Sequence, residues 1–99
     1  MTNYKISNKA EKDIRGIYLY GFQRFGEARA DAYYKALFER IEQIATHPYR
    51  YPKATNIRQG YRKSVIASET IYYRIAGNDT VEIMAVLRRQ NIRDNLDGQ

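Results

Sequence analysis

The sequence predicts an α+β domain in which a helical hairpin packs on one face of a twisted antiparallel sheet. In the first half, apolar residues recur with a period near 3.6 over two segments that are long enough to be helices. In the second half, the period changes to two over three short segments, which is typical of strands. A chain of 99 residues is the size of one domain, so residues 1–99 are expected to share a single core.

The chain begins with a short strand that leads directly into the first helix. The segment NYKIS, residues 3–7, alternates between polar and apolar side chains. Asn8 and Glu11 are the residue types of a capping box, which predicts that Asn8 is the N-cap. Apolar residues then follow at helical spacing up to the break at RFGE: Ala10, Ile14, Ile17, Tyr18, Gly21 and Phe25.

A second helix is expected from Glu27 up to Pro48, because proline disfavours helical backbone in the residue before it. The connection at Gly26 is short, so the two helices should form an antiparallel hairpin. One apolar stripe of the second helix is predicted to be buried: Ala30, Tyr34, Leu37, Ile41 and Ile44.

Three strands are expected in succession after the irregular stretch of residues 48–60. They cover residues 61–67, 70–76 and 80–89, and tight turns join them into an antiparallel meander. A loop of residues 77–79 sets Ile75 opposite Val81, whereas a shorter loop would divide the apolar residues between both faces of the sheet. The longer loop is therefore preferred.

The preferred register has consequences for the arginines of the last two strands. It places Arg74 opposite Glu82 as a cross-strand ion pair and Tyr72 opposite Met84. It also puts Arg88 on the same sheet face as Arg74. One face of the last strand is predicted to be apolar along its whole length: Val81, Ile83, Ala85 and Leu87.

Composition excludes several classes of function. The chain has no cysteine and a single histidine, His47, so disulfides, thiolate catalysis and a metal centre are not expected. No glycine-rich nucleotide motif occurs, and no cofactor is expected. The sequence has neither an apolar run of about 18 residues nor a signal-peptide pattern, which predicts a cytoplasmic protein with no membrane partner.

The net charge of +6 is unevenly distributed, because no carboxylate lies between Glu42 and Glu69. Such a basic stretch is typical of a surface that binds an anionic partner, such as nucleic acid or an acidic protein. A solvated loop can have the same composition. Cations and tyrosines alternate in this basic stretch: Arg50, Lys53, Arg58, Arg62 and Lys63, with Tyr49, Tyr51 and Tyr61.

Metal-free cleavage of RNA needs a base for the 2′-hydroxyl, an acid for the leaving oxygen and cations for the phosphorane. Arginines supply only the cations, because a guanidinium stays protonated. After Tyr73 the chain has no tyrosine or histidine. Of the conceivable bases, Glu82 is assigned to Arg74 and Glu69 to a turn. The sequence therefore favours binding over catalysis.

The helices carry more aromatic residues than one buried stripe can hold. Tyr20 and Phe22 lie off the face formed by Ile14, Ile17 and Tyr18. Exposed aromatic residues next to charges indicate a protein interface, although partial burial of one or two tyrosines is also normal.

Together these segments resemble the ParE-type toxins of the RelE/ParE toxin–antitoxin superfamily over nearly the whole chain. The resemblance rests on SNKAEKDIRGIYLYGFQRFG, IEQIATHPYRYP, GYRKSV, IYYRI and TVEIMAVLRRQNIRDNL. It implies a non-catalytic toxin that blocks DNA gyrase, and hence replication, and that a ParD-like antitoxin neutralises in a hetero-oligomer. The RNA-cutting branch commonly brings a His or Tyr in the last strand or tail, where this chain has Arg88, Arg89, Gln90 and Asn91.

Gyrase inhibition, with indirect contact to DNA through gyrase, is therefore the leading hypothesis. The alternative is ribosome-dependent cleavage of messenger RNA by Arg62, Arg74 and Arg88 with Glu82 or another residue that the sequence does not identify. The resemblance implies that the antitoxin adds a helix to the hairpin and a strand to an exposed strand edge. The expected target-binding residues are Arg62, Arg74, Arg88, Arg89 and Arg93, and the expected antitoxin-binding residues are Tyr18, Tyr20, Phe22, Tyr33 and Phe38.

Overall fold

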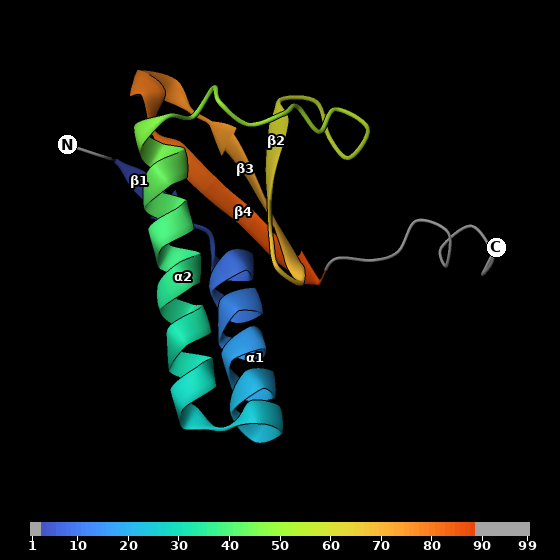
Figure 1. The fold of residues 1–99 in the computed structure, drawn as a ribbon. Helices are drawn as coiled ribbons and strands as arrows, with labels where there is room; N and C mark the ends of the chain where they lie inside the picture. Colours follow the sequence, from blue (N-terminus) through green and yellow to red (C-terminus); the bar gives the residue numbers. More distant parts are fainter. Residues whose placement is uncertain (1–2, 89–99) are drawn as a thin grey trace, which may run out of the picture.

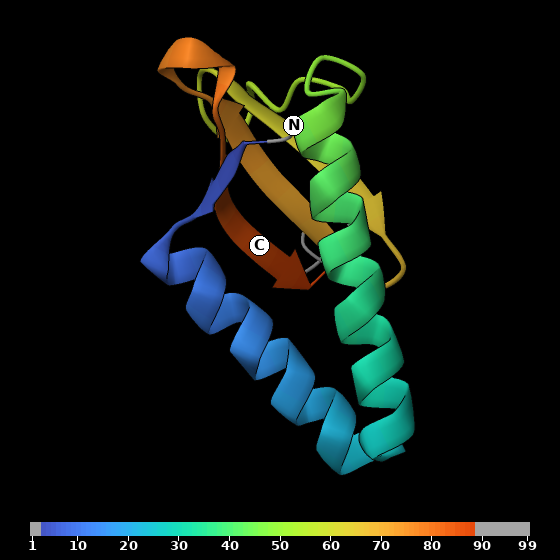
Figure 2. The ribbon, with the colours of Figure 1, turned by 90° about the vertical axis from the view of Figure 1, so that its left-hand side faces the viewer.

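The computed structural model describes residues 3–88, which form two long helices and a four-stranded sheet. Both helices lie on one face of the sheet, and their connected ends extend beyond it (Figures 1 and 2), which confirms the predicted α+β class. In this part of the chain, neither helix combines the length and hydropathy of a membrane span. The elements are β1 (Tyr4–Ile6), α1 (Asn8–Phe25), α2 (Glu27–Thr46), β2 (Tyr61–Ile66), β3 (Glu69–Ile75), the 3-10 turn η1 (Gly77–Asp79) and β4 (Val81–Arg88).

The sheet has the order β1-β4-β3-β2 and is mixed rather than wholly antiparallel. β2, β3 and β4 form the predicted antiparallel meander. β1 runs parallel to β4, with Ile6 next to Ile83. The hairpin explains the direction of β1: α1 leads away from the sheet and α2 returns, so β1 and β2 begin at the same end (Figure 1). The sheet therefore differs from the predicted antiparallel one at this single strand.

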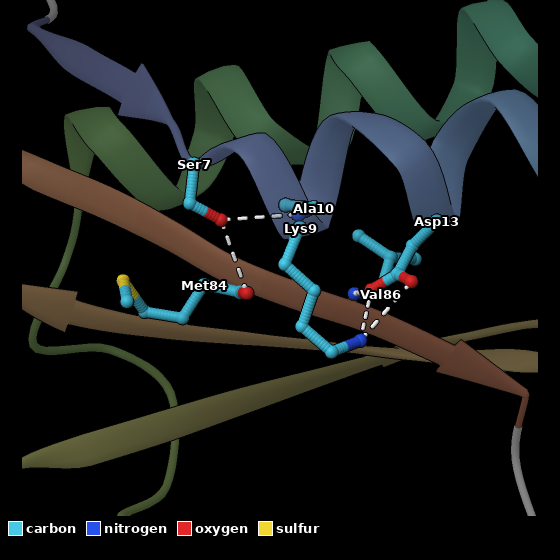
Figure 3. Close-up of polar contacts among 6 residues, drawn as sticks. All are labelled: Ser7, Lys9, Ala10, Asp13, Met84 and Val86. Atoms are coloured by element: carbon cyan, nitrogen blue, oxygen red, sulfur yellow. Dashed lines mark hydrogen bonds and ion pairs between the residues drawn. The ribbon is translucent and has the colours of Figure 1, made fainter.

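The N-cap of α1 is Ser7 and not the predicted Asn8. The Ala10 amide donates a hydrogen bond to Ser7 Oγ at 3.0 Å, and the Ser7 backbone is extended, as is usual for an N-cap. The same Oγ donates to the Met84 carbonyl oxygen at 3.1 Å (Figure 3). Ser7 thus caps the helix and ties its start to β4.

The first turns of α1 cover the part of the β4 edge that the short β1 leaves open. Directly after β1, the Ser7 amide donates to the Ile83 carbonyl oxygen at 3.0 Å. Farther along the edge, the Val86 amide donates to Asp13 Oδ2 at 3.0 Å, and Lys9 Nζ lies 2.9 Å from that oxygen (Figure 3). Polar groups of α1 therefore satisfy backbone groups that an open edge would expose to other strands.

The connection between β3 and β4 confirms the predicted loop. Residues 77–79 form a 3-10 turn, and Ile75 lies opposite Val81. Asn78 and Asp79 adopt left-handed backbone with φ of 62° and 56°. Asn and Asp tolerate this conformation better than most residues, so the sequence suits the turn.

A β-bulge moves the end of β4 out of the predicted register. Tyr73 pairs with Ile83, but Tyr72 pairs with Ala85 and not with Met84. Met84 is therefore an extra residue on β4. Because side chains alternate along a strand, one extra residue exchanges the two faces for the remainder of β4.

This exchange of faces corrects two expectations. Val86 is only 2% exposed, whereas Leu87, which was predicted to share the apolar face, is 42% exposed. Arg88 lies opposite Glu69 and contacts α1, so it faces the helices and does not share a face with Arg74 as predicted. The bulge thus decides where a candidate functional residue lies.

The core lies between the hairpin and the helix-facing side of the sheet. Tyr34 was predicted to belong to the buried stripe of α2 but is 44% exposed, and Tyr33 packs against the core instead. The remaining members of that stripe are buried as predicted. The largest fully buried side chains are Tyr73, Leu37, Ile41, Ile44, Ile71, Ile83, Val81 and Val86.

Candidate functional site

A groove of about 310 Å³ opens where the hairpin extends beyond the end of the sheet. Both helices, the turn between β2 and β3 and the end of β4 line this groove, which we call the sheet-end groove. Its lining combines apolar side chains with charged and phenolic groups. These include Ile17, Tyr20, Phe25, Arg29, Tyr33, Leu37, Glu69 and Arg88.

Arg88 and Tyr20 form a stacked pair in the sheet-end groove. The guanidinium carbon of Arg88 on β4 lies 4.7 Å from the centroid of the Tyr20 ring on α1. The Arg88 guanidinium beside the phenol lowers the pKa of Tyr20 below its ordinary value, and the charge of Arg24 lowers it further. The structure thus joins a residue predicted to bind the target with one predicted to bind the antitoxin.

Glu69 and Tyr33 form a second polar contact in the same groove. Glu69 was expected in a turn, but it begins β3 and is only 6% exposed. The Tyr33 hydroxyl donates to the Glu69 carboxylate and also lies 3.0 Å from the Ile66 carbonyl oxygen. Burial, together with the hydrogen bond to Glu69, raises the pKa of Tyr33. Glu69 therefore has a phenol partner inside the groove.

A row of four aromatic rings crosses the hairpin. Ring centroids are 6.2 Å apart between Phe22 and Tyr18, 5.6 Å between Tyr18 and Tyr34, and 4.9 Å between Tyr34 and Phe38. The Tyr18 hydroxyl donates to Asp31 Oδ1 at 2.6 Å, which links α1 to α2 and raises the pKa of Tyr18. We call these four residues the aromatic row.

The aromatic row borders a groove of about 450 Å³ between the two helices. The helices diverge from their connected ends toward the sheet (Figure 2), and the sides of this interhelical groove come from both. It is lined by Ile6, Glu11, Ile14, Arg15, Tyr18, Asp31, Tyr34 and Phe38. The predicted antitoxin-binding residues are thus spread over adjacent surfaces: Tyr20 and Tyr33 line the sheet-end groove, Phe22 and Phe38 belong to the row, and Tyr18 belongs to both.

The predicted target-binding arginines do not form one cluster. Arg74 Nε donates to Glu82 Oε1 at 2.7 Å, which confirms the predicted ion pair, and this pair lies on the sheet face away from the helices. Arg62 lies at the far end of the sheet, where its guanidinium donates to the Tyr51 carbonyl oxygen at 2.7 Å. Arg88 lies in the sheet-end groove. Arg89 and Arg93 lie outside the described residues.

The chain matches the family model described as the ParE toxin of the type II toxin–antitoxin system, parDE, over residues 4–93. The chain belongs to the ParE toxin family. It is 36% identical to Toxin ParE1 of Caulobacter vibrioides over 97 residues, which covers 97% of this chain and 99% of that protein. It is 30% identical to Toxin ParE1 of Mycobacterium tuberculosis over 96 residues, covering 96% and 98% of the two chains.

Two solved structures have the same fold as this ParE toxin. One is the chromosomal ParDE toxin–antitoxin system from P. aeruginosa, with a TM-score of 0.79 and 17% identity over 91% of this chain and 98% of that one. The other is the toxin–antitoxin complex RelBE2 from Mycobacterium tuberculosis, with a TM-score of 0.63 and 18% identity over 89% and 98%. At these identities the likeness establishes the fold.

The structure of this ParE toxin changes one argument made from the sequence. The end of β4 was expected to lack a group that could pass a proton, because no tyrosine or histidine follows Tyr73. A phenol is nevertheless present there, because α1 brings Tyr20 to Arg88. The position of Tyr20 off the buried stripe was the available signal, but only the packing of α1 against β4 shows which residue it meets.

Proposed function

We propose that this ParE toxin inhibits DNA gyrase by binding rather than by catalysis, and that a ParD-like antitoxin neutralises it in the cytosol. The observation that carries the proposal is the stacked pair of Arg88 and Tyr20. It presents a fixed cation beside an aromatic ring, a combination that is enriched where proteins bind one another. Glu69, the carboxylate among the described residues that line this groove, accepts a hydrogen bond from Tyr33, which favours a structural role for it over a catalytic one.

The antitoxin-binding surface that we propose is the aromatic row together with the two grooves beside it. An amphipathic helix binds by laying its apolar face into a hydrophobic groove, and the interhelical groove offers Tyr18, Tyr34 and Phe38 to such a face. Phe22 is 45% exposed and Tyr34 is 44% exposed, so these rings have apolar area left to bury. The solved ParDE and RelBE2 relatives are toxin–antitoxin assemblies, which supports an antitoxin as the partner.

Strand addition by the antitoxin would use the β2 edge, because the other edge strand, β1, has only three residues and α1 covers the described part of the β4 edge beyond it. Segment 48–60 covers the beginning of β2, where the Lys63 amide donates to the Pro52 carbonyl oxygen at 3.0 Å. Toward the end of β2, Arg40 donates to the Val65 carbonyl oxygen at 2.8 Å. An added strand would have to displace that arginine.

Target and antitoxin should compete for this toxin. Tyr20 belongs to the surface proposed for the antitoxin and Arg88 to the one proposed for gyrase, and the two side chains are in contact. A partner that covers one therefore covers the other. Neutralisation would then be direct occlusion of the target-binding residue.

A supercoiling assay with purified gyrase tests the proposal. The toxin should inhibit supercoiling, Arg88→Ala should weaken the inhibition at least about tenfold, as expected for loss of a central arginine contact, and antitoxin should restore supercoiling. Lys12→Ala is the matched control, because Lys12 is exposed on α1, its variant loses the same charge, and Lys12 lines neither groove. Uninhibited gyrase at saturating toxin would contradict the proposal.

The pair of Tyr20 and Arg88 also favours a second candidate function, the cleavage of ribosome-bound messenger RNA. A phenol with a lowered pKa beside a cation is a possible proton-transfer group near a phosphate. The residues first considered for this chemistry do not support it, because Arg62, Arg74 and Arg88 lie in three separate places. Transcripts cut in a translation-coupled assay by the wild type, but left intact by Tyr20→Phe, would establish this function instead.

A further inference from the structure

A pocket of about 500 Å³ lies at the end of the sheet opposite to the sheet-end groove. Segment 48–60 and the turn between β3 and β4 form it, and both lie away from the connected ends of the helices (Figures 1 and 2). We call it the loop pocket. The side chains that matter for its chemistry are Tyr49, Lys53, Gln59, Tyr61, Arg62 and Asp79.

Arg62 is held in a fixed position in the loop pocket. Its guanidinium donates to the Tyr51 carbonyl oxygen at 2.7 Å, and its guanidinium carbon lies 5.2 Å from the centroid of the Tyr49 ring. The backbone beside Tyr49 is also anchored, because the hydroxyl of the fully buried Tyr73 donates to the Pro48 carbonyl oxygen at 2.6 Å. A cation fixed in this way loses little entropy when a ligand binds.

Lys53 lies directly opposite Arg62 in an isolated antiparallel bridge. The flanking hydrogen bonds, from the Ala54 amide to the Tyr61 carbonyl oxygen at 2.7 Å and from the Lys63 amide to the Pro52 carbonyl oxygen at 3.0 Å, make this a non-hydrogen-bonded pair. In such pairs the side chains project to one face and approach most closely.

Like charges that lie directly opposite each other on two strands repel. The pair of Lys53 and Arg62 therefore destabilises the fold unless an anion lies between them. In residues 3–88, neither Lys53 nor Arg62 forms an ion pair with a carboxylate. Asp79 is the one acidic residue among those that line the loop pocket in the described chain. The pocket therefore offers two adjacent cations to an anionic group.

Tyr49 adds a recognition element that a plain cationic patch lacks. It is 63% exposed, so much of its ring surface is accessible although Arg62 stacks on it. Nucleobases stack on exposed aromatic rings beside cations, whereas an acidic peptide has no group that needs such a ring. Volumes of this size accommodate ligands as large as a nucleotide.

We propose that the loop pocket binds single-stranded nucleic acid, with a backbone phosphate between Lys53 and Arg62 and a base stacked on Tyr49. The proposal is independent of gyrase inhibition, because the pocket and the sheet-end groove share no lining residue. It gives the basic stretch of residues 49–63 a direct role that the proposed toxin activity does not require.

Fluorescence anisotropy with a labelled oligouridylate of about ten nucleotides tests the proposal on the intact toxin. Lys53→Glu should weaken binding at least about tenfold, because it removes one phosphate contact and gives Arg62 a carboxylate partner. Lys35→Glu is the matched control: it makes the same charge change on the exposed surface of α2 and should weaken binding much less. Equal weakening by the two variants would show non-specific attraction and overturn the proposal.

The stacking contact has its own test. Tyr49→Phe should bind like the wild type and Tyr49→Ala on the order of tenfold more weakly, because phenylalanine keeps the ring. Folding is checked by thermal melting, and Lys53→Glu should melt at or above the wild-type temperature because it replaces a repulsive pair. A poly-glutamate peptide of equal charge that competes as well as unlabelled oligouridylate would overturn the proposal in favour of an acidic protein partner.

Discussion

At the scale of single residues, tyrosine hydroxyls form important hydrogen bonds inside this toxin. Tyr73 is fully buried and its hydroxyl holds the Pro48 carbonyl oxygen, while Tyr33 holds Glu69. Burial raises the pKa of Tyr73 to about 12 and also raises that of Tyr33. A phenol can donate a hydrogen bond only while it is protonated. Both contacts are therefore retained below the ordinary tyrosine pKa of about 10, where the unfolded chain is protonated as well.

The raised pKa values predict a loss of stability in alkali. Above the ordinary tyrosine pKa of about 10, the unfolded chain releases protons that the folded chain still binds, so the free energy of unfolding falls as pH rises toward 12. The upper limit is about 1.4 kcal/mol per pH unit for each phenol, and partial exposure of Tyr33 reduces its share. Urea denaturation between pH 8 and 11 measures this slope, and Tyr33→Phe should make it shallower. An equal slope in the variant would contradict the attribution of this pH dependence to Tyr33.

The ion pair of Arg74 and Glu82 should contribute to stability rather than to toxicity. Both side chains are partly exposed, at 50% and 26%, so Arg74→Ala should lower the free energy of unfolding by only about 0.2 to 1 kcal/mol. A double-mutant cycle with Glu82→Ala, read by urea denaturation, isolates the pair. Growth arrest by Arg74→Ala should match the wild type, and loss of toxicity in a stably folded variant would return Arg74 to the target-binding set.

At the scale of elements, α1 acts as the neighbour of β4 beyond the end of β1. The Ser7 hydroxyl binds the carbonyl oxygen of the bulged Met84, and the Asp13 carboxylate binds the amide of Val86 two residues later (Figure 3). The bulge turns Arg88 toward the helices. The position of Arg88 therefore depends on the polar contacts that hold α1 along this edge as well as on the sequence of β4.

Removing the Asp13 carboxylate should show how much its hydrogen bond to the β4 edge contributes to stability. Asp13→Ala leaves the Val86 amide without its acceptor and should lower the free energy of unfolding by about 1–3 kcal/mol. Asp13→Asn should cost less, because its amide oxygen still accepts a hydrogen bond. Lys9→Ala removes only the ion pair with Asp13 and should cost about 0.3–0.5 kcal/mol. A cost for Asp13→Ala no greater than that for Lys9→Ala would show that the edge contact contributes nothing.

At the scale of the whole molecule, three surfaces of different chemistry are spread over one small fold. The sheet-end groove and the aromatic row lie on the hairpin, and the loop pocket lies at the other end of the sheet. The first two surfaces are adjacent, which predicts competition between their partners. The loop pocket is separate, so its ligand should bind together with the antitoxin.

Deletion of residues 93–99 should separate folding from toxicity. Every helix and strand described here lies within residues 3–88, so the shortened chain should fold and bind antitoxin with unchanged affinity. It should no longer arrest growth if Arg93 contacts the target. Growth curves at matched expression, with antitoxin affinity measured by calorimetry, check both outcomes, and persistent killing would remove Arg93 from the target-binding set.

Much of the fold could be predicted because periodicity and turn chemistry are local. Pro48 ended the second helix near the predicted position, and the loop of residues 77–79 set Ile75 opposite Val81. The exposure of Tyr20 and Phe22 also followed from their place off the buried stripe. The shift from Tyr34 to Tyr33 in the core is a rotation of less than half a helical turn, which a pattern of apolar residues does not resolve.

The sequence by itself determined the order of elements, the register at the turn of β3 and β4 and the pair of Arg74 with Glu82. Only the tertiary structure decided the parallel β1, the bulge at Met84 and the meeting of Arg88 with Tyr20. The physical reason is the distance along the chain: the Ser7 hydroxyl that binds the bulged residue is 77 positions away from it. Contacts of that range leave no period in the sequence, yet one extra residue on β4 is enough to send Arg88 to the opposite face.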